Sequence, residues 1–302
     1  MRVFVTGATG MIGTGVVTEL LGEGHRVLGL ARSETAANAL ARLGAEVHPG
    51  DLSKPETLAA GARACDGAIH LGFVMDFSDL RGAFATDLRA IDALGAALAG
   101  SDRPFVHTTG TLLLTAGRVG TEDDAADPAS VVSLRVPAEN QALAWADKRV
   151  RVSVVRPAPT VHGPRDHHGF IPMLIATARK TAIAAYVGDG ANRWPAVHHN
   201  DCARVYARAL ARGAERARYH AVGEEGVPMR QIAEAIGRRL RVPAVSLSAA
   251  EAEAHFGSFI GPLIATDNPV SNALTRQWLD WTPAHPGLGL IADLEDAHYF
   301  TT

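Results

Sequence analysis

A glycine-rich stretch near the start of the chain constrains its fold more than any other feature. It reads TGATGMIG, from Thr6 to Gly13, directly after a β-rich run over residues 2–6, and it opens a helical pattern with apolar residues at 12, 16 and 20. In this order the first glycine allows a tight turn, the second lets the backbone approach a pyrophosphate, and the third permits close packing of helix on strand. The helix N-terminus adds unpaired N–H groups and the positive end of its dipole. The pattern predicts dinucleotide binding, rather than a tight turn without a ligand, through Gly7, Thr9, Gly10, Met11, Ile12 and Gly13.

The first half of the chain alternates short β-rich runs with helical patterns. The expected strands cover residues 2–6, 26–31, 45–48, 67–71, 105–108 and 151–155. Two expected helices stop at Gly24 and Gly44, which suit left-handed caps, and a longer helix carries an apolar stripe through Phe84, Leu88, Ile91 and Leu98. This alternation predicts right-handed βαβ units, and therefore an α/β fold with a Rossmann-type doubly wound parallel sheet.

The second half of the chain differs from the first in its pattern of Pro and Gly residues. Six Pro and Gly residues fall between residues 157 and 172, which predicts a loop at the carboxyl edge of the sheet. Further on, the apolar spacing of residues 232, 236 and 240 predicts a helix, and Ser248 with Glu251 has capping-box spacing for another. The C-terminal third is therefore expected to form a small lobe.

Composition excludes several classes of protein. The 302 residues are 47% hydrophobic, enough for a substantial core, and their 29 basic and 32 acidic side chains give a net charge of −3, with no positive field for nucleic acid or an anionic membrane. Cys65 and Cys202 lack metal-ligand spacing and suit a reducing compartment. A strand expected from residue 2 leaves no room for a signal peptide, and no run of 18 apolar residues occurs. We expect a soluble, cytoplasmic protein.

The end of the second expected strand indicates the cofactor. An NAD site usually offers a carboxylate to the ribose diol there, but this chain has Arg32 and Ser33. The planar fork of Arg32 suits a 2′-phosphate and the Ser33 hydroxyl adds a donor, which favours NADP(H) over NAD(H). The alternative for Arg32 is an ordinary exposed charge. Further cofactor contacts are expected after the third and fourth strands, at Asp51, Leu52, Gly72 and Phe73.

Four segments together resemble one known family. They read TGATGMIG at the start, GAIHLGF at the fourth strand, FVHTTGT at the fifth and VVRPAPTVHGP at the sixth. In these segments the chain resembles the extended short-chain dehydrogenase/reductase superfamily, in its NAD-dependent epimerase/dehydratase branch. The resemblance implies a dinucleotide-binding core over residues 1–163, to which residues 189–222 return. It also implies a substrate lobe over 164–188 and 223–302, and homodimers that pair through two long helices.

The chain departs from the family at its catalytic pair, a Tyr followed four residues later by a Lys between the fifth and sixth strands. All its tyrosines stand elsewhere, at positions 186, 206, 219 and 299. Matching the helix places Val131 and Arg135 at the two positions, or Arg135 and Glu139 after a slip of four residues. Gly110 falls near the family's Ser, and Asp87 stands for an Asn of the preceding helix. The resemblance therefore implies an atypical member.

Other side chains are candidates for the missing chemistry. Thr109 and Thr111 can orient a carbonyl oxygen, and Arg135 can stabilise an oxyanion or a cofactor ribose without readily delivering a proton. Histidine is the natural acid at neutral pH, which nominates His162 and His168 near the expected substrate edge. The alternatives are a packing position for His162 and a surface position for His168. No second ligand cluster accompanies these histidines, so no metal is expected.

The remaining site residues follow from the resemblance. Residues 157–160 resemble the segment that faces the nicotinamide through its backbone. Arg193 and Trp194 stand where the family often contacts substrate, and such a pair can hold a carboxylate or phosphate. The alternatives are a salt bridge of Arg193 with Asp189 and a core position for Trp194. Trp278 and Trp281 fit packing within the lobe. The expected cofactor contacts here are Thr108, Pro157 and Thr160, and the expected substrate contacts are Phe73, Phe170, Arg193 and Trp194.

These features predict an NADP(H)-dependent oxidoreductase that acts on a small carbonyl compound or its alcohol. A non-catalytic NAD(P)-binding sensor or partner-binding protein is the main alternative, because the missing Tyr and Lys fit a loss of catalysis. A nucleotide-sugar epimerase or dehydratase is disfavoured, since it needs the absent Tyr to move protons at the sugar.

Overall fold

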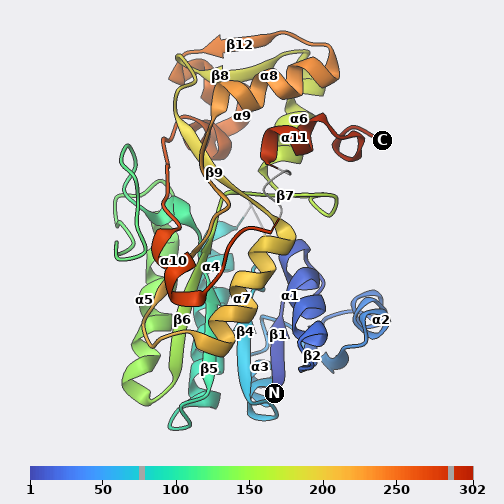
Figure 1. Ribbon diagram of the computed structural model, residues 1–302, viewed down its shortest axis with the longest axis vertical. Coiled ribbons are helices and arrows are strands. Elements are labelled where there is room, and N and C mark those ends of the chain that lie inside the picture. The colour runs from blue at the N-terminus through green and yellow to red at the C-terminus, as the bar shows by residue number, and fades with distance from the viewer. Residues whose placement is uncertain (75–78, 285–288, 302) are drawn as a thin grey trace.

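The computed structural model describes residues 1–74, 79–284 and 289–301. Within them, the largest sheet has seven strands, all parallel, in the order β10-β6-β5-β4-β1-β2-β3 (Figure 1). The order reverses between β1 and β4, where α/β sheets open a ligand crevice at their carboxyl edge. The strands are β1 (Arg2–Thr6), β2 (Arg26–Ala31), β3 (Glu46–Pro49), β4 (Gly67–His70), β5 (Pro104–Thr108), β6 (Arg151–Pro157) and β10 (Arg218–Ala221).

Helices cover both faces of this sheet, because its strands are apolar on both sides. In β1, Val3 and Val5 join one hydrophobic cluster with α1 and α7, whereas Phe4 joins a cluster with α3, α4 and α5 on the opposite face. The helices are α1 (Met11–Gly22), α2 (Glu34–Leu43), α3 (Pro55–Arg63), α4 (Leu80–Leu98), α5 (Val136–Ala144) and α7 (His199–Arg212). Short 3-10 helices occur at η1 (Thr111–Leu113), η2 (Ser133–Arg135), η3 (Trp145–Lys148) and η4 (Ala297–Tyr299).

A smaller body with its own core lies beyond the carboxyl edge of the large sheet (Figure 1). Its helices are α6 (Phe170–Thr181), α8 (Met229–Leu240), α9 (Ala249–Ile264) and α11 (Leu290–Glu295). They pack around a parallel pair formed by β8 (Ala184–Val187) and β12 (Ala244–Leu247). A second, three-stranded sheet links the two bodies, in the order β11 (Glu224–Pro228), β9 (Arg193–His198) and β7 (Thr160–His162).

Most elements expected from the sequence are confirmed. Each of the six expected strands is present within two residues of its expected bounds. Gly24 and Gly44 have φ of 79° and 86°, and Gly44 closes α2 in the left-handed conformation. The capping box at Ser248 is complete, with bonds in both directions to Glu251. The predicted α/β, Rossmann-type class is therefore the one observed.

Two regions differ from expectation. The expected loop over residues 157–172 contains β7 and the start of α6, because β7 pairs with β9 from a distant part of the chain. Residues 223–302 do not all belong to the lobe. Val270, Leu279 and Trp281 join the core of the large sheet, and α10 (Ala273–Leu279) packs on α7 and β10. The reason is that this apolar segment covers a face next to the sheet's edge strand.

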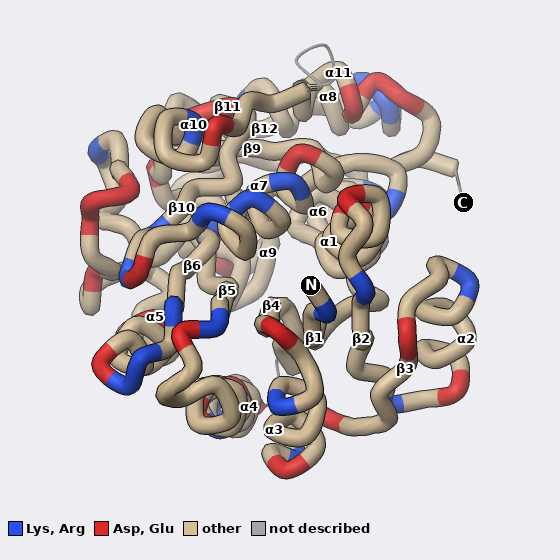
Figure 2. Tube along the Cα trace, turned by 60° about the horizontal axis from the view of Figure 1, so that its bottom comes forward, with Lys and Arg blue, Asp and Glu red and all other residues tan. Residues whose placement is uncertain are grey.

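The helices of the described residues are all too short or too polar to cross a membrane. Charges of both signs are interspersed along the helices in Figure 2, so this view presents no face of a single sign.

Candidate cofactor-binding and active site

The turn between β1 and α1 has the shape of a phosphate-binding turn. Gly7 has a φ of 66°, and a Cβ there would lie 2.7 Å from the backbone nitrogen of Gly72. A Cβ on Gly13 would lie 2.0 Å from the carbonyl oxygen of Gly7. Gly10 is the N-cap of α1 and offers no side-chain bond, and the first turn contains no acidic residue. The first N–H groups of α1 are thus available to an anion, as the diphosphate of a dinucleotide requires.

Two neighbouring loops complete this crevice. Gly72, after β4, donates its N–H to the Thr6 hydroxyl over 3.1 Å. Leu52, after β3, packs closely against Gly72. A Cβ added to Gly72 would lie 2.9 Å from a methyl carbon of Leu52. Asp51 accepts hydrogen bonds from the backbone and hydroxyl of Ser53, which hold the pKa of its carboxyl below the usual value. The residues predicted at Asp51, Leu52 and Gly72 therefore lie beside the glycine turn.

The end of β2 presents an exposed cation and a capped helix. Arg32 is exposed, and its charge contributes to the low pKa of Asp51. The Ser33 hydroxyl oxygen accepts from the Ala36 N–H at 3.2 Å and so caps α2, while its own hydrogen stays available. The side chains of Arg32 and Ser33 are therefore both exposed at the carboxyl end of β2.

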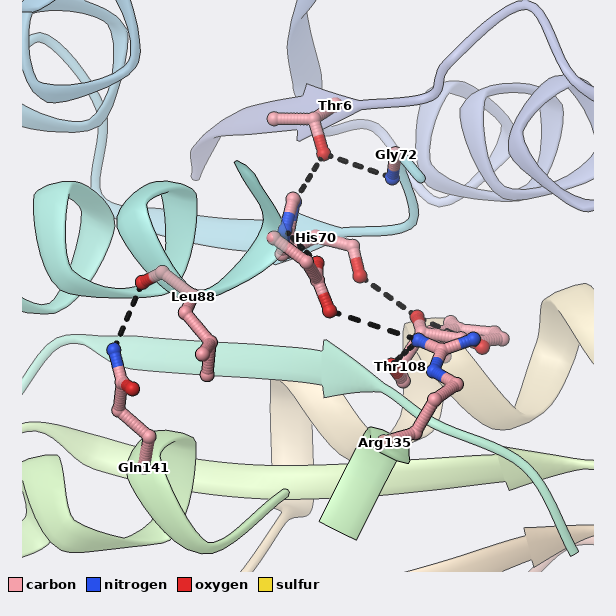
Figure 3. A network of polar contacts seen from close by, with 9 residues as sticks. Thr6, His70, Gly72, Leu88, Thr108, Arg135 and Gln141 are labelled. Carbon is pink, nitrogen blue, oxygen red and sulfur yellow. Dashed lines mark hydrogen bonds and ion pairs between the residues drawn. The ribbon is translucent and has the colours of Figure 1, made fainter. Parts of the chain in front are cut away.

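A network of polar side chains lies at the carboxyl ends of β4 and β5 (Figure 3). The His70 ring joins the Thr6 hydroxyl at 2.6 Å and the Asp87 carboxylate at 3.2 Å. Arg135 approaches the second Asp87 oxygen to 3.8 Å and donates to the Thr108 carbonyl at 3.2 Å. Its guanidinium carbon stands 4.6 Å from the centre of the Phe73 ring. Predicted residues Phe73, Thr108 and Arg135 are thus brought together.

A tyrosine reaches the same network from the other face of the sheet. Tyr206 of α7 donates to the Thr108 hydroxyl at 3.0 Å, and that hydroxyl donates to the His70 carbonyl at 2.7 Å. Burial raises the pKa of Tyr206 well above its usual value, so it stays neutral. Thr6, His70 and Tyr206 are absent from the residues that the sequence nominates. His70 could have been found from the sequence, because it is a polar residue at the end of an apolar strand. Nothing in the sequence indicates Tyr206, because its partner Thr108 lies 98 residues away.

The two candidate threonines already have acceptors for their hydroxyl hydrogens. Thr109 donates to Glu139 at 3.0 Å, and Thr111 donates to Asn268 at 3.1 Å, both in buried surroundings. Glu139 also accepts from Arg156 at 3.0 Å and from Arg218 at 2.8 Å. Burial opposes the ionisation of Glu139, but the bonds from both arginines hold its pKa below the usual value. Glu139 therefore belongs to a buried ion cluster next to the site, whereas Arg135 faces the network.

The candidate histidines lie in different surroundings. His162 is buried at the end of β7, and its Nδ1 is 2.8 Å from the Asp293 carboxylate of α11. Next to it, Tyr299 accepts the Gly163 N–H at 3.2 Å and donates to Asp166 at 2.9 Å. His168 is exposed, as expected if it occupies a surface position. His162 thus joins the loop after β7 to the C-terminal segment.

The expected substrate residues in the lobe include one core position. Trp194 is 0% exposed, with its indole N–H donated to the Thr266 carbonyl and the Phe170 ring 5.3 Å away. Arg193 forms its salt bridge with Asp267, at 3.0 Å, and not with Asp189. The Asp189 carboxylate instead accepts the N–H of Ala191. The partner of Arg193 differs because residues 264–268 run beside β9.

The last expected residues also turn inward. Pro157 is buried at the end of β6, and the Thr160 hydroxyl donates to the Pro195 carbonyl of β9. Trp281 packs in the core of the large sheet rather than in the lobe, with its indole N–H on the Asp201 carbonyl, and Trp278 meets the Tyr219 ring edge-on. Among the described residues, no group of three or more His, Cys, Asp or Glu side chains has metal-binding geometry.

Comparison with known proteins places this geometry in a family. The model of the NAD dependent epimerase/dehydratase family matches residues 3–222. Uncharacterized protein C2A9.02 of Schizosaccharomyces pombe is 43% identical over 99% of this chain and 100% of its own length. A 4-hydroxy-2-methyl-3-oxo-4-farnesyl-3,4-dihydroquinoline-1-oxide ketoreductase of Stigmatella aurantiaca is 28% identical, over 85% of this chain and 80% of its own. The crystal structure of gox2253 has a TM-score of 0.78 at 23% identity, and covers 98% of this chain and 96% of that one. The chain belongs to the NAD dependent epimerase/dehydratase family.

Proposed function

We propose that the protein is an NADP(H)-dependent oxidoreductase that interconverts a small carbonyl compound and its alcohol. The observation that carries this proposal is the uncapped N-terminus of α1 behind Gly7 and Gly13, with a charged guanidinium, Arg135, held beside the next two strand ends. The first feature suits a dinucleotide, and the second suits a carbonyl oxygen that gains negative charge. The similarity to a ketoreductase supports the same class of reaction.

The preference for NADP(H) rests on the end of β2. An exposed Arg32 and the free hydrogen of Ser33 stand where an NAD site usually places a carboxylate. A guanidinium binds a phosphate dianion through paired, charge-assisted hydrogen bonds. The 2′-phosphate therefore gains contacts here that a ribose diol lacks.

The proposed site has a cofactor side and a substrate side. The glycine turn, Asp51, Leu52, Gly72, Thr108 and residues 157–160 are proposed to line the cofactor. Phe73, Phe170 and Arg193 are proposed to face the substrate, with the buried Trp194 packed behind Phe170. The nicotinamide supplies or accepts the hydride. The protein's groups proposed to orient the carbonyl or serve its proton are Thr109, Thr111, Arg135, His162 and His168. A homodimer, which the resemblance to the family implies, is the last part of the proposal.

Cofactor titration tests this function. Protein fluorescence is followed as NADPH and NADH are added, and a panel of aldehydes, ketones and imines is then screened for loss of reduced-cofactor absorbance. We expect tighter binding of NADPH, and turnover of at least one carbonyl class. No measurable affinity for either nucleotide contradicts the proposal outright.

Arg32→Asp tests the cofactor preference. Loss of the guanidinium and gain of a carboxylate should weaken NADPH binding by about 10- to 100-fold, because one charge-assisted contact is replaced by repulsion. NADH binding should change by less than about threefold. Arg42→Asp, an exposed arginine of neighbouring α2, is the matched control. Equal losses for both cofactors remove Arg32 from the specificity argument.

A second function is favoured by one observation, the absence of the family's Tyr and Lys pair. A cofactor-binding sensor or partner-binding protein needs the crevice but no proton donor. Tight NADPH binding without turnover on the whole carbonyl panel supports that function instead.

A further inference from the structure

The carboxylate of Asp87 is buried and only half satisfied. Its Oδ1 meets His70, while its Oδ2 is buried without a hydrogen-bond partner among the described residues and stands 3.8 Å from Arg135. Burial opposes ionisation of Asp87, yet the hydrogen bond from His70 and, to a smaller extent, the charge of Arg135 hold its pKa below the usual value. A buried carboxylate is costly without a counter-charge, and the Arg135 guanidinium is the cation nearest to its free oxygen.

A chain of hydrogen bonds leads from the glycine turn to Asp87. The Gly72 N–H donates to the Thr6 hydroxyl oxygen at 3.1 Å, and this hydroxyl is hydrogen-bonded to Nδ1 of His70 at 2.6 Å. Because a carboxylate only accepts, Nε2 of His70 carries a proton and donates it to Asp87. Asp87, with its pKa held low, is the anion that faces the Arg135 guanidinium. The glycine turn is thereby linked, through side chains, to the position of Arg135 (Figure 3).

Arg135 keeps most of its donors available. In the described part of the chain it donates a single hydrogen bond, from Nη2 to the Thr108 carbonyl, and its Nε has no partner. Its side chain is 23% exposed, and the Phe73 ring supports the guanidinium. The hydroxyl groups of Thr109 and Thr111, by contrast, already donate hydrogen bonds to Glu139 and Asn268. Among the candidates near the network, Arg135 alone offers free N–H groups.

We propose that Arg135 stabilises the negative charge on the substrate's carbonyl oxygen during reduction, and that Asp87 is its positioning residue, fixed by His70 and Thr6. This inference rests on the proposed function. When bound, the reduced cofactor supplies a hydride to the carbonyl carbon, and the C=O π electrons move to the oxygen. Arg135 pairs with the resulting alkoxide but keeps its protons, because a guanidinium does not deprotonate at physiological pH. A water molecule gives the alkoxide its proton and leaves as hydroxide.

The test uses the reductase assay with the best carbonyl of the panel. Arg135→Ala should lower kcat by about 10²- to 10³-fold, as loss of an oxyanion donor does, with the NADPH Kd changed by less than about threefold. Arg135→Lys should restore part of the rate, and millimolar guanidinium should raise kcat of the alanine variant but not of the wild type. A structural role alone predicts no such chemical rescue.

Asp87→Asn tests the positioning role. We expect a fall in kcat of about tenfold, because an amide holds the guanidinium less firmly, and a change of less than about twofold when the substitution is added to Arg135→Ala. Unchanged NADPH affinity shows that each variant is folded. The control pair is Arg149→Ala and Asp102→Asn, which removes an exposed ion pair near the amino ends of β5 and β6, at the opposite edge of the sheet from the site, and should leave kcat unchanged.

The outcomes separate the inference from the function. If the wild type turns over and Arg135→Ala retains its kcat, the inference is wrong and the proposed function stands. If Asp87→Asn lowers kcat equally with and without Arg135, Asp87 is not its positioning residue. If the wild type reduces no carbonyl compound, both the function and the inference fall.

Discussion

At the scale of single residues, several histidines are held neutral by burial. Burial lowers the pKa of His107 to about 3, of His220 to about 3 and of His199 to about 4. His107 is fully enclosed, stacked on His70, and neither of its ring nitrogens has a hydrogen-bond partner among the described residues. Such a ring contributes packing to the core but cannot accept a proton without leaving it.

His107→Phe should flatten the acid dependence of stability. The pKa of His107 in the folded state lies below the unfolded value of 6.5. Above pH 6.5 the residue is neutral in both states and adds no pH dependence, whereas below pH 6.5 the unfolded state alone gains a proton. The wild type therefore loses up to about 1.4 kcal/mol of unfolding free energy per pH unit through this residue as pH falls from 6.5 toward 4. Urea unfolding at several pH values measures the slope. The exposed His167→Asn is the control, and an unchanged slope in His107→Phe counts against the argument.

Side-chain partners are the part of the site that sequence predicts least. The positions of Arg135 and Asp87 could be inferred from the helices around them, but their encounter depends on strand order. Arg193 shows the same limit, because its partner Asp267 lies 74 residues away rather than four. Sequence spacing indicates which residues are candidates, but tertiary packing determines which partners their side chains bind.

At the scale of elements, the two ends of α1 differ in how closely the helix is packed. Its first turn approaches Gly7 closely, so Gly13 has no room for a Cβ atom. A Cβ atom on Gly22, at the other end of the helix, would have no neighbouring atom within 4 Å. Both residues are glycines in the same helix, and only the first is required by contact.

Gly13→Ala and Gly22→Ala should therefore act in opposite directions. Gly13→Ala forces the turn away from the helix, which should cost about 1–3 kcal/mol of stability and weaken NADPH binding, since the phosphate-binding N–H groups move. Gly22→Ala should raise the unfolding free energy by about 0.5–1 kcal/mol, because alanine loses less backbone entropy, and leave binding unchanged. Chemical unfolding and fluorescence titration measure both quantities. A Gly13→Ala protein that binds NADPH normally contradicts this account of the turn.

The elements that sequence predicts well are those with local signals. Strands β1 to β6 alternate with helices, of which α2 begins at the capping side chain of Ser33 and ends at Gly44, so their order and bounds could be inferred. Strand β7 has three residues, and its pairing with β9 brings together positions 36 apart, such as Thr160 and Ala196. A strand of this kind gains its stability from a distant partner and leaves little trace in its own composition.

At the scale of the whole molecule, the C-terminal segment is attached to the linking sheet at β7 and to the loop that follows it. Tyr299 bonds to the loop after β7 through Gly163 and Asp166, and Asp293 bonds to His162. These contacts are buried and polar, so each leaves an unsatisfied group when its partner is removed.

Tyr299→Phe should loosen this attachment. The Gly163 N–H and the Asp166 carboxylate each lose a buried partner, which should lower the unfolding free energy by about 1–3 kcal/mol. Hydrogen exchange should accelerate in residues 161–170 more than in β1. Tyr186→Phe is the control, because the Tyr186 hydroxyl makes no hydrogen bond within the described ranges. Unaltered exchange around Gly163 contradicts the role given to Tyr299.

The return of Leu279 and Trp281 to the core that holds Val3 and Val5 has a consequence for synthesis. The ribosome delivers the amino end first, yet one face of the sheet can bury its last apolar side chains only after residue 281 has emerged. The nascent chain therefore carries an open hydrophobic surface through most of its translation, and a product truncated before that point exposes it permanently.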